Sequence, residues 1–509
     1  MVVVLFFLVL LLLPPTALAE PVVPTPEELL AMGKAQVGER WYGIYVLGSK
    51  VGWQKDAWLE KDGLLCSDTE FILTMGFMGK TTSIGSHEVS CFSATPPLNL
   101  VTFLQEKDED GRKVRIEGKQ EETRSEDATK TTKADAWAAS NEKELRFEVD
   151  AGGRKRSYTA PADSVLLLHM VPWAAVARMK PGDHVDSGTF DELTGKKRWE
   201  KITLKGTEEK ALILRPVRLH RFRIQDETGV DLDALVSGEG HVLEGTLGPS
   251  IRIVLEDRET ARRKDVHMLD LYSTSFVPAT GELDYAMAVR VKRLKLSLTG
   301  KAAISLAENP RQKTIETGDN RVTLEVTACP ARVRGAPPAG DHLKCDADIP
   351  CDLAEIKEQA EKIAAKKKGE LDKARALTDW VHRRFKYTLG GGGGTGDMIL
   401  QEKSGDCTEF SKGLLTLLRA VGIRSRLVSG IVPATQKPLS FGYHAWVEAW
   451  IDGRGWVALD PTWGEFPVDA AHVIFDVEQG LQMATHLGGL EMEILEVEYS
   501  KTFGEIKCE

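Results

Sequence analysis

The sequence predicts a largely antiparallel β-rich region over residues 41–300 and an α+β domain over residues 351–480. In the first region, short apolar segments alternate with turns rich in Gly, Asp and Lys. In the second, the apolar residues first follow helical spacing, and segments with strand-like alternation come only after residue 425. A chain of 509 residues is long enough for about two to four domains.

Composition and charge argue against one broad class of function. Apolar residues make up 42% and charged residues 28% of the chain, as is usual for soluble globular proteins. The 66 basic and 76 acidic residues give a net charge of −10. Because nucleic acids bind clustered basic surfaces and no basic cluster stands out, we expect no nucleic-acid partner.

Residues 1–19 predict a signal peptide. The unbroken apolar run Val2–Leu13 ends at Pro14-Pro15, and Ala17-Leu18-Ala19 then supplies a small-x-small cleavage signal. The run is shorter than the roughly 20 residues that span a bilayer. Because no Lys or Arg precedes it, an uncleaved membrane anchor remains the alternative. We expect a secreted or periplasmic protein without stable membrane insertion after cleavage, in which residues 20–40 form an N-terminal segment.

The first predicted strands are Trp41–Val46 and Val51–Trp58, which flank the turn signal Gly48-Ser49. The highly charged stretch Asp108–Lys133 predicts a solvated hairpin and loop. Further candidate strands are Ser67–Thr74, Ser83–Ser93, Glu144–Val149, Lys210–Val217 and Ile251–Leu255.

Residues 301–350 are expected to hold connecting strands and a linker. The Gly- and Pro-rich segment Ala331–Asp341 is the candidate linker. Beyond it, Leu353–Lys368 predicts a charged, Ala-rich helix and Glu370–Tyr387 an amphipathic one. Residues 481–509 are expected to form a C-terminal extension.

A glycine-rich stretch follows the second helix. Residues 391–396 match G-x-G-x-x-G, but a dinucleotide site also needs a preceding strand and a following helix. We therefore interpret Gly390–Gly394 as a flexible loop and expect no cofactor.

The seven cysteines indicate disulfides rather than metal ligands. Cys66 and Cys91 are equidistant from Met78-Gly79, the middle of a turn-like stretch, so a regular hairpin would place them opposite each other. A disulfide is expected there, and two independent core thiols are the alternative. His342, Cys345 and Cys351 match no standard zinc spacing, so a disulfide is the better interpretation and no metal is expected.

Cys407 is predicted to be the first residue of a helix. Asp406 is a suitable N-cap, and Glu409 completes an acidic capping box. The helix dipole stabilises an anion there by about 0.3–1 kcal/mol, which is less than one pKa unit. The two neighbouring carboxylates oppose it, so a reactive thiolate also needs a histidine partner.

His444 is the candidate partner. It lies in the predicted strand 441–451, on the face opposite Ala445, Val447, Ala449 and Ile451. Asp460 ends the return strand, just before a proline. A connection of odd length brings Asp460 onto the histidine face, whereas a two-residue connection does not. The pairing therefore predicts a bulged turn around Gly453 and Gly455.

Three motifs resemble those of the transglutaminase-like superfamily: Gly405-Asp406-Cys407, Tyr443-His444-Ala445-Trp446-Val447-Glu448 and Trp456-Val457-Ala458-Leu459-Asp460-Pro461-Thr462. The segment Leu418–Arg426 is similar to the superfamily's helix-to-strand connection. The resemblance implies a papain-like α+β fold over 351–480, with Cys407 as nucleophile, His444 as base and Asp460 as its orienting residue. The β-rich half resembles N-terminal regions of some exported bacterial members, on Trp41–Trp53.

The implied chemistry is acyl transfer through a thioester on protein or peptide amides. Hydrolysis by a protease or amidase is favoured because water needs no binding site of its own. A protein-crosslinking transglutaminase and a non-catalytic peptide- or envelope-binding module remain alternatives. The backbone N–H of Cys407 is one candidate oxyanion donor, and the second stays open between Tyr387, Gln401 and others. We expect Trp446, Trp450, Trp456 and Trp463 to form core and pocket wall.

Overall fold

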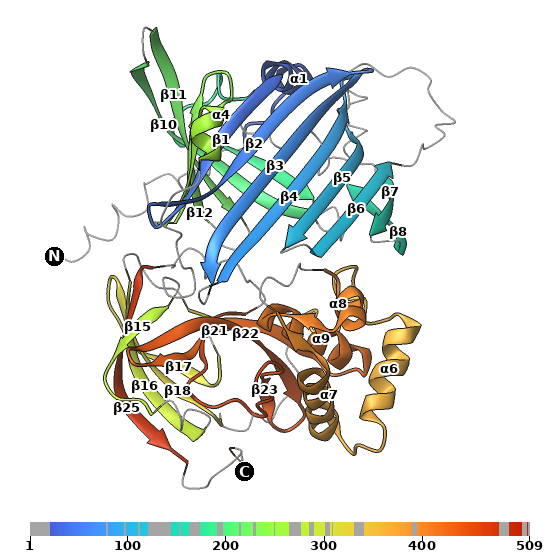
Figure 1. Cartoon of the computed structure of the whole chain (residues 1–509), viewed down its shortest axis with the longest axis vertical. Helices are drawn as coiled ribbons and strands as arrows, with labels where there is room; N and C mark the ends of the chain where they lie inside the picture. The colour runs from blue at the N-terminus through green and yellow to red at the C-terminus, as the bar shows by residue number, and fades with distance from the viewer. Residues whose placement is uncertain are drawn as a thin grey trace, which may run out of the picture.

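The first of two large sheets contains the N-terminal strands of the chain (Figure 1). The structure, a computed structural model, describes residues 21–77, 80–95, 98–109, 112–120, 144–151, 154–161, 174–190, 197–212, 215–226, 231–248, 250–263, 276–284, 290–300, 306–307, 309–329, 340–388, 394–477, 488–500 and 506. The expected signal peptide, most of the expected linker and most of the glycine loop lie outside these residues.

Within the described residues, the first sheet has 14 strands in the order β8-β7-β6-β5-β4-β3-β2-β1-β14-β13-β12-β11-β10-β9. Strands that follow each other in the chain pair antiparallel, and β1 also pairs antiparallel with β14. The strands are β1 Gly38–Val46, β2 Ser49–Lys61, β3 Leu64–Phe77, β4 Lys80–Ser93, β5 Leu100–Glu109, β6 Arg112–Gln120, β7 Glu144–Ala151, β8 Arg154–Pro161, β9 His184–Phe190, β10 Lys197–Leu212, β11 Arg215–Asp226, β12 Asp231–Ser237, β13 Val242–Leu247 and β14 Ile251–Glu256.

Most strands predicted in this region are confirmed. The first hairpin turns at Leu47 and at Gly48, which adopts a φ of 83° that favours glycine. The other predicted strands fall within β3, β4, β7 and β14, and the charged stretch after residue 108 begins with the β5–β6 hairpin. Its remainder lies outside the described residues.

The predicted strand Lys210–Val217 is wrong. The chain reverses inside it, and Lys210 pairs with Val217 across the β10–β11 hairpin. The run has no Gly, Asn or Asp at the reversal, and its one turn-favouring residue, Pro216, comes after it, so the local pattern hid the reversal.

Two short helices pack against the first sheet. In α1 (Pro26–Ala35), Thr25 is the N-cap and forms a capping box with Glu28. Leu29 of α1 is 1% exposed and packs in the apolar cluster of Trp58, Leu65 and Phe92. The second helix, α4 (Arg258–Arg262), follows β14.

The second sheet has nine strands among the described residues, in the order β17-β18-β16-β25-β15-β22-β21-β24, with β23 paired to β22. Most pairs are antiparallel, and β15 runs parallel to β25. The strands are β15 Val277–Thr280, β16 Val291–Gly300, β17 Gln312–Thr317, β18 Arg321–Thr327, β21 Ser425–Gln436, β22 Leu439–Ile451, β23 Gly455–Leu459, β24 Val473–Val477 and β25 Leu490–Tyr499.

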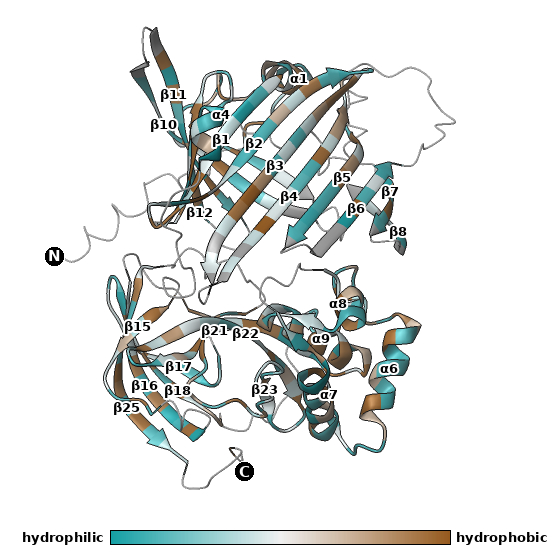
Figure 2. Cartoon of the chain, in the orientation of Figure 1, coloured by the Kyte–Doolittle hydropathy of each residue, from teal (hydrophilic) through white to brown (hydrophobic). Residues whose placement is uncertain are grey.

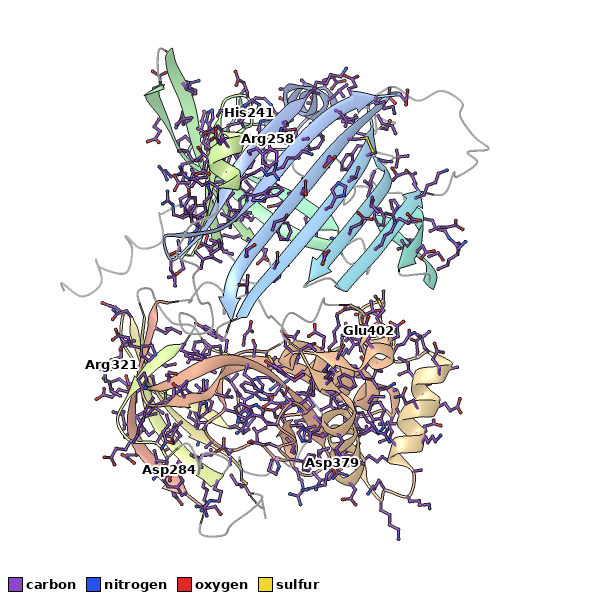
Figure 3. All side chains as sticks on the ribbon, in the orientation of Figure 1. His241, Arg258, Asp284, Arg321, Asp379 and Glu402 are labelled. Atoms are coloured by element: carbon purple, nitrogen blue, oxygen red, sulfur yellow. A yellow bond between two sulfur atoms is a disulfide. The ribbon has the colours of Figure 1, made fainter. Side chains whose placement is uncertain are left out.

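The second sheet begins earlier in the chain than the expected boundary at residue 300. Its strands β15 and β16 precede that residue, and β16 pairs along its length with β25 near the C-terminus. Leu294, Leu296 and Leu298 alternate along β16 and are fully buried. Arg321 of β18, labelled in Figure 3, forms an ion pair with Glu493 of β25, and both side chains are about half exposed.

Four helices pack beside β22 at one end of the second sheet (Figure 1). They are α6 Ala354–Ala364, α7 Glu370–Arg384, α8 Gly396–Glu402 and α9 Cys407–Ala420. Figure 2 shows hydrophilic and hydrophobic residues along α6 and α7, as amphipathic helices require. After α7, β19 (Lys386–Tyr387) pairs with β20 (Ser404–Gly405), directly before α9.

The predicted helices are confirmed, with α7 ending three residues before Tyr387. The chain thus has antiparallel β-rich sheets and, at its C-terminal end, a unit of helices and strands. No helix among the described residues combines the length and apolarity that crossing a membrane requires.

Both predicted disulfides are present. Cys66 and Cys91 pair directly across the β3–β4 hairpin, with their Cα atoms 4.0 Å apart, and are bonded to each other. Cys345 is bonded to Cys351, as expected in preference to a zinc site. Cys329 is also disulfide-bonded, and Cys407 is a free thiol.

Candidate active site

Cys407 is the first residue of α9, as predicted. The Asp406 side chain accepts a hydrogen bond from the N–H of Thr408 at 2.8 Å, and Glu409 accepts one from the N–H of Asp406 at 2.9 Å. Burial, together with the charge of Asp406, raises the pKa of Glu409 to about 8. Gly405 has a φ of 151°, and a Cβ there would lie 2.4 Å from that of Glu409, so only glycine fits.

Ser411 ties this helix to the strand that carries His444. It lies one helical turn after Cys407 and is fully buried. Its Oγ donates a hydrogen bond of 3.0 Å to the backbone carbonyl of Ala445. Sequence analysis missed this contact because the acceptor is a backbone atom.

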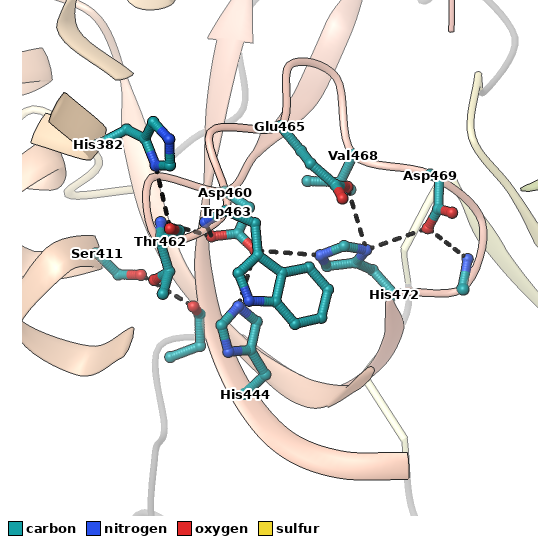
Figure 4. Close-up of polar contacts among 12 residues, drawn as sticks. His382, Ser411, His444, Asp460, Thr462, Trp463, Glu465, Val468, Asp469 and His472 are labelled. Atoms are coloured by element: carbon teal, nitrogen blue, oxygen red, sulfur yellow. Dashed lines mark hydrogen bonds and ion pairs between the residues drawn. The ribbon is translucent and has the colours of Figure 1, made fainter. Parts of the chain in front are cut away.

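His444 lies in β22 and is 6% exposed. Its Nε2 is 2.8 Å from Oδ2 of Asp460 (Figure 4). The β22–β23 register pairs Ile451 with Gly455, so the connection has the predicted odd length of three residues. The predicted bulge is wrong, because the pairing continues without a register shift and the odd length alone brings Asp460 to the histidine face.

Asp460 is fully buried and receives four hydrogen-bond donors or ion-pair contacts. Oδ1 accepts hydrogen bonds from the backbone N–H groups of Thr462 and Trp463, at 2.7 and 3.2 Å. Oδ2 contacts His444 and, at 3.4 Å, Nε2 of His472. Burial alone would raise the pKa of Asp460, but attraction and hydrogen bonds from the two histidines hold it below the usual range.

Cys407 approaches the same histidine. Burial by itself would lower the pKa of His444. Attraction to Asp460, its hydrogen bond and a further hydrogen bond with Cys407 outweigh burial and raise that pKa to about 10. Because Nε2 faces Asp460, Nδ1 is the nitrogen left for the thiol. His444 is thus bonded to Asp460, and Cys407 is among the groups that raise its pKa.

Tryptophan rings surround the histidine. The ring of Trp463 stacks on that of His444 with centroids 5.0 Å apart and is 39% exposed. Trp446 is fully buried, with its ring centroid 6.3 Å from that of His444. Trp450 and Trp456 are buried in the core, so the four tryptophans divide between core and wall as expected.

The sequence analysis missed His472. This buried residue directly precedes β24, and its Nδ1 lies 3.3 Å from Oδ1 of Asp469. Twelve residues separate it from Asp460, and only the folding back of the intervening loop brings the two together. The sequence signal is weak: a histidine after the last of the three motifs.

Two groups of side chains among the described residues have ligand atoms close enough to hold a metal ion. One comprises His444, Asp460 and His472, and the other comprises Glu465, Asp469 and His472. Both share His472, whose two ring nitrogens already contact Asp460 and Asp469. Because the arrangement is accounted for as hydrogen bonds and ion pairs, we assign no metal to it.

The second oxyanion donor stays open. Tyr387 is 52% exposed and lies in β19, beside Gly405 of β20. Gln401 lies in α8. Neither residue has a geometry that singles it out as a donor.

The comparisons with known proteins concern the region that holds this site. Residues 357–461 match the family model of the transglutaminase-like superfamily. Over 122 residues the chain is 33% identical to a protein-glutamine gamma-glutamyltransferase of Pseudomonas aeruginosa, across 22% of this chain and 17% of that protein. Over 77 residues it is 31% identical to the uncharacterized protein YebA of Bacillus subtilis, across 13% of this chain and 10% of that protein.

The chain thus matches less than a fifth of the length of either curated relative. Among solved structures, it is similar to a candidate cysteine protease from Cytophaga hutchinsonii, at 15% identity and a TM-score of 0.30. That similarity covers 43% of this chain and 94% of the other.

Proposed function

From the transglutaminase-like domain at residues 357–461, we propose that this protein is a cysteine acyl-transfer enzyme acting on protein or peptide amides. Cys407 is the nucleophile, His444 its base and Asp460 the residue that orients His444. The observation that carries the proposal is that a buried imidazole bonds a buried carboxylate, while the free thiol at the N-terminus of α9 is among the groups that raise the pKa of that imidazole.

The reaction proceeds through a thioester. Because the pKa of His444 is raised, the proton of Cys407 already resides on Nδ1 of His444 in the resting pair, and the thiolate attacks the amide carbonyl to form a C–S bond. The Cys407 backbone N–H donates to the developing oxyanion. The imidazolium returns its proton to the leaving nitrogen as the C–N bond breaks. Water then attacks the thioester with His444 as base, which releases the acid and restores the thiol.

Asp460 keeps the imidazole in the tautomer that presents Nδ1 to the thiol. The two backbone N–H groups on its Oδ1 fix the plane of the carboxylate. Trp463 covers one face of His444 and limits the access of water to the His444–Asp460 bond. A helix that carries the nucleophile, packed on an antiparallel sheet that carries histidine and aspartate, supports a papain-like α+β arrangement for this domain.

Hydrolysis is the favoured outcome because water needs no site of its own. The second candidate is transfer to an amine, because a relative that is 33% identical over 122 residues is a protein-glutamine gamma-glutamyltransferase. Amine transfer uses the same thioester and differs only in the group that resolves it.

We also propose that the enzyme works outside the cytoplasm, as a secreted or periplasmic protein. The apolar run at residues 2–13 supports export. The Cys66–Cys91 and Cys345–Cys351 disulfides support it independently, because such bonds persist in oxidising compartments.

Mass spectrometry of the protein incubated with a peptide library tests the proposal, with and without a primary amine. We expect an acyl adduct on Cys407 and cleaved or deamidated peptides, with amine-linked products if transamidation dominates. Cys407→Ala and His444→Ala should each abolish turnover without unfolding the chain, and Asp460→Asn should leave residual activity. Full turnover by Cys407→Ala would refute the proposal.

A further inference from the structure

A second buried histidine contacts the same oxygen of the Asp460 carboxylate as His444 does. His472 is 1% exposed, and its Nε2 lies 3.4 Å from the same Oδ2 that bonds His444 (Figure 4). Its other nitrogen, Nδ1, lies 3.3 Å from Oδ1 of Asp469. The ring therefore links two carboxylates, one of which belongs to the candidate active site.

The contacts of the two ring nitrogens favour the charged form of this ring. Both carboxylate oxygens already accept other donors, because Oδ2 of Asp460 accepts from His444 and Oδ1 of Asp469 from the N–H of Ala471. Ionised carboxylates only accept hydrogen bonds, so both ring nitrogens of His472 must donate, which only an imidazolium can do. Attraction to the surrounding carboxylates outweighs burial and raises the pKa of His472, in agreement with this assignment.

The groups around the ring balance this charge. Oε2 of Glu465 lies 4.0 Å from Nδ1, and the fully buried Arg311 also attracts Glu465 and Asp469. The rings of Trp446 and Trp463 meet the imidazole edge-on, with centroids 5.1 and 5.6 Å away. His444, with its ring centroid 6.1 Å away, is the other titratable ring nearby.

The position of His472 in the chain shows which segment it holds in place, namely the loop that follows Asp460. The backbone N–H of Asp460 donates to the carbonyl of Glu465, and the N–H of Glu465 donates to the carbonyl of Asp460, both at 3.0 Å. The loop between them carries Trp463, which stacks on His444. His472 closes the second half of the same loop onto the Asp460 side chain.

We propose that His472 is a positioning residue, a charged imidazole that holds Asp460 ionised and directed at His444. The proposal rests on the proposed function, since it presupposes that Asp460 orients His444. Without His472, Asp460 would lose one of its four polar contacts and the nearest cation besides His444. The His444 ring would then be less well aligned with Cys407.

Two amide substitutions separate this role from a purely structural one. In His472→Gln the amide nitrogen replaces Nε2 and keeps a donor for Asp460. In His472→Asn it replaces Nδ1 and keeps only the Asp469 contact. The readout is the rate of Cys407 alkylation by iodoacetamide at about pH 6.5, followed by peptide mapping, which needs no known substrate.

We expect His472→Asn to slow alkylation by about tenfold and His472→Gln by less than about threefold. In an Asp460→Asn background, His472→Asn should add less than about twofold, because both changes interrupt the same interaction. His382→Asn is the matched control, because His382 contacts the Thr462 carbonyl of the same loop but not Asp460. Cys407 in this variant should be alkylated at the wild-type rate.

Several results would overturn the inference: an unchanged rate in His472→Asn, a larger loss in His472→Gln than in His472→Asn, or multiplicative losses in the double variant. Ring-nitrogen NMR of the wild type provides a measurement that does not depend on folding of a variant. It should show His472 doubly protonated at pH 7, and a neutral ring would refute the proposal. If wild-type Cys407 reacts no faster than in His444→Ala, the proposed function itself fails.

Discussion

The hydroxyl of Ser411 should help to hold the nucleophile helix against the histidine strand. Ser411 and Ser425 are both fully buried, which makes them a matched pair. The Ser411 hydroxyl joins α9 to β22 through the Ala445 carbonyl, whereas the Ser425 hydroxyl, in β21, has no hydrogen-bond partner among the described residues. Ser411→Ala therefore removes a buried hydrogen bond, and Ser425→Ala removes an unsatisfied polar group.

The two substitutions should change the free energy of unfolding in different directions. Ser411→Ala should destabilise the protein by about 1 kcal/mol, and Ser425→Ala should be neutral or stabilising by up to about 1 kcal/mol. If the whole loss in Ser411→Ala falls on the alignment of Cys407 with His444, alkylation of Cys407 at about pH 6.5 should slow by about fivefold.

The assay compares urea unfolding midpoints and iodoacetamide rates of the wild type and the two variants. The C-terminal tryptophans report the unfolding of this domain. The reasoning is refuted if Ser411→Ala matches the wild type in both measurements, or if Ser425→Ala is the more damaging change.

Three further changes are expected to have measurable effects. Burial, opposed by His472 and reinforced by Asp469 and Asp460, raises the pKa of Glu465 to about 7. The contribution of Glu465 to stability is therefore complete below about pH 4.5 and is lost as pH rises through about 7. Glu465→Gln should stabilise the protein at pH 8 by on the order of 2 kcal/mol. Equal pH profiles of unfolding for the variant and the wild type would contradict this. In Gly430→Ala the new Cβ would lie 2.0 Å from the Val473 carbonyl oxygen, so thermal unfolding should show a loss of about 1–3 kcal/mol in the free energy of unfolding. The control Gly245→Ala has open space around the new Cβ and should lose less than about 0.5 kcal/mol. Reductive loss or double Ala substitution of the Cys66–Cys91 bridge, with a sequence separation of 25, should cost about 3 kcal/mol in the first sheet, with the Cys407 alkylation rate unchanged.

The local signals around the candidate site were strong enough to predict the start of α9 and the faces of the β22–β23 hairpin. A capping box acts over three residues, so Asp406 and Glu409 located the start of α9 without tertiary information. Strand parity acts over one hairpin, so the faces of β22 and β23 could be worked out from the sequence alone. These two short-range rules place Cys407 at the start of a helix and His444 and Asp460 on one face of a hairpin, whereas the packing of that helix on the strand is a long-range contact.

What the sequence missed depends on contacts between distant segments. The pairing of β16 with β25 joins residues about 200 positions apart, and no local pattern places β16 in the second sheet. His472 reaches Asp460 only because the loop after β23 folds back, and Ser411 acts through a backbone carbonyl. The reversal inside Lys210–Val217 was missed for a different reason, since the segment has no Gly, Asn or Asp and its one turn-favouring residue, Pro216, stands after the reversal.

The central claim is that His444 activates Cys407. The most direct test is the rate of Cys407 alkylation by iodoacetamide from pH 5 to 9 in the wild type and in His444→Ala. The account predicts that wild-type Cys407 reacts readily at about pH 6, whereas in His444→Ala its rate follows an ordinary thiol with an apparent pKa near 8.5. Superimposable profiles for the two proteins would contradict the account.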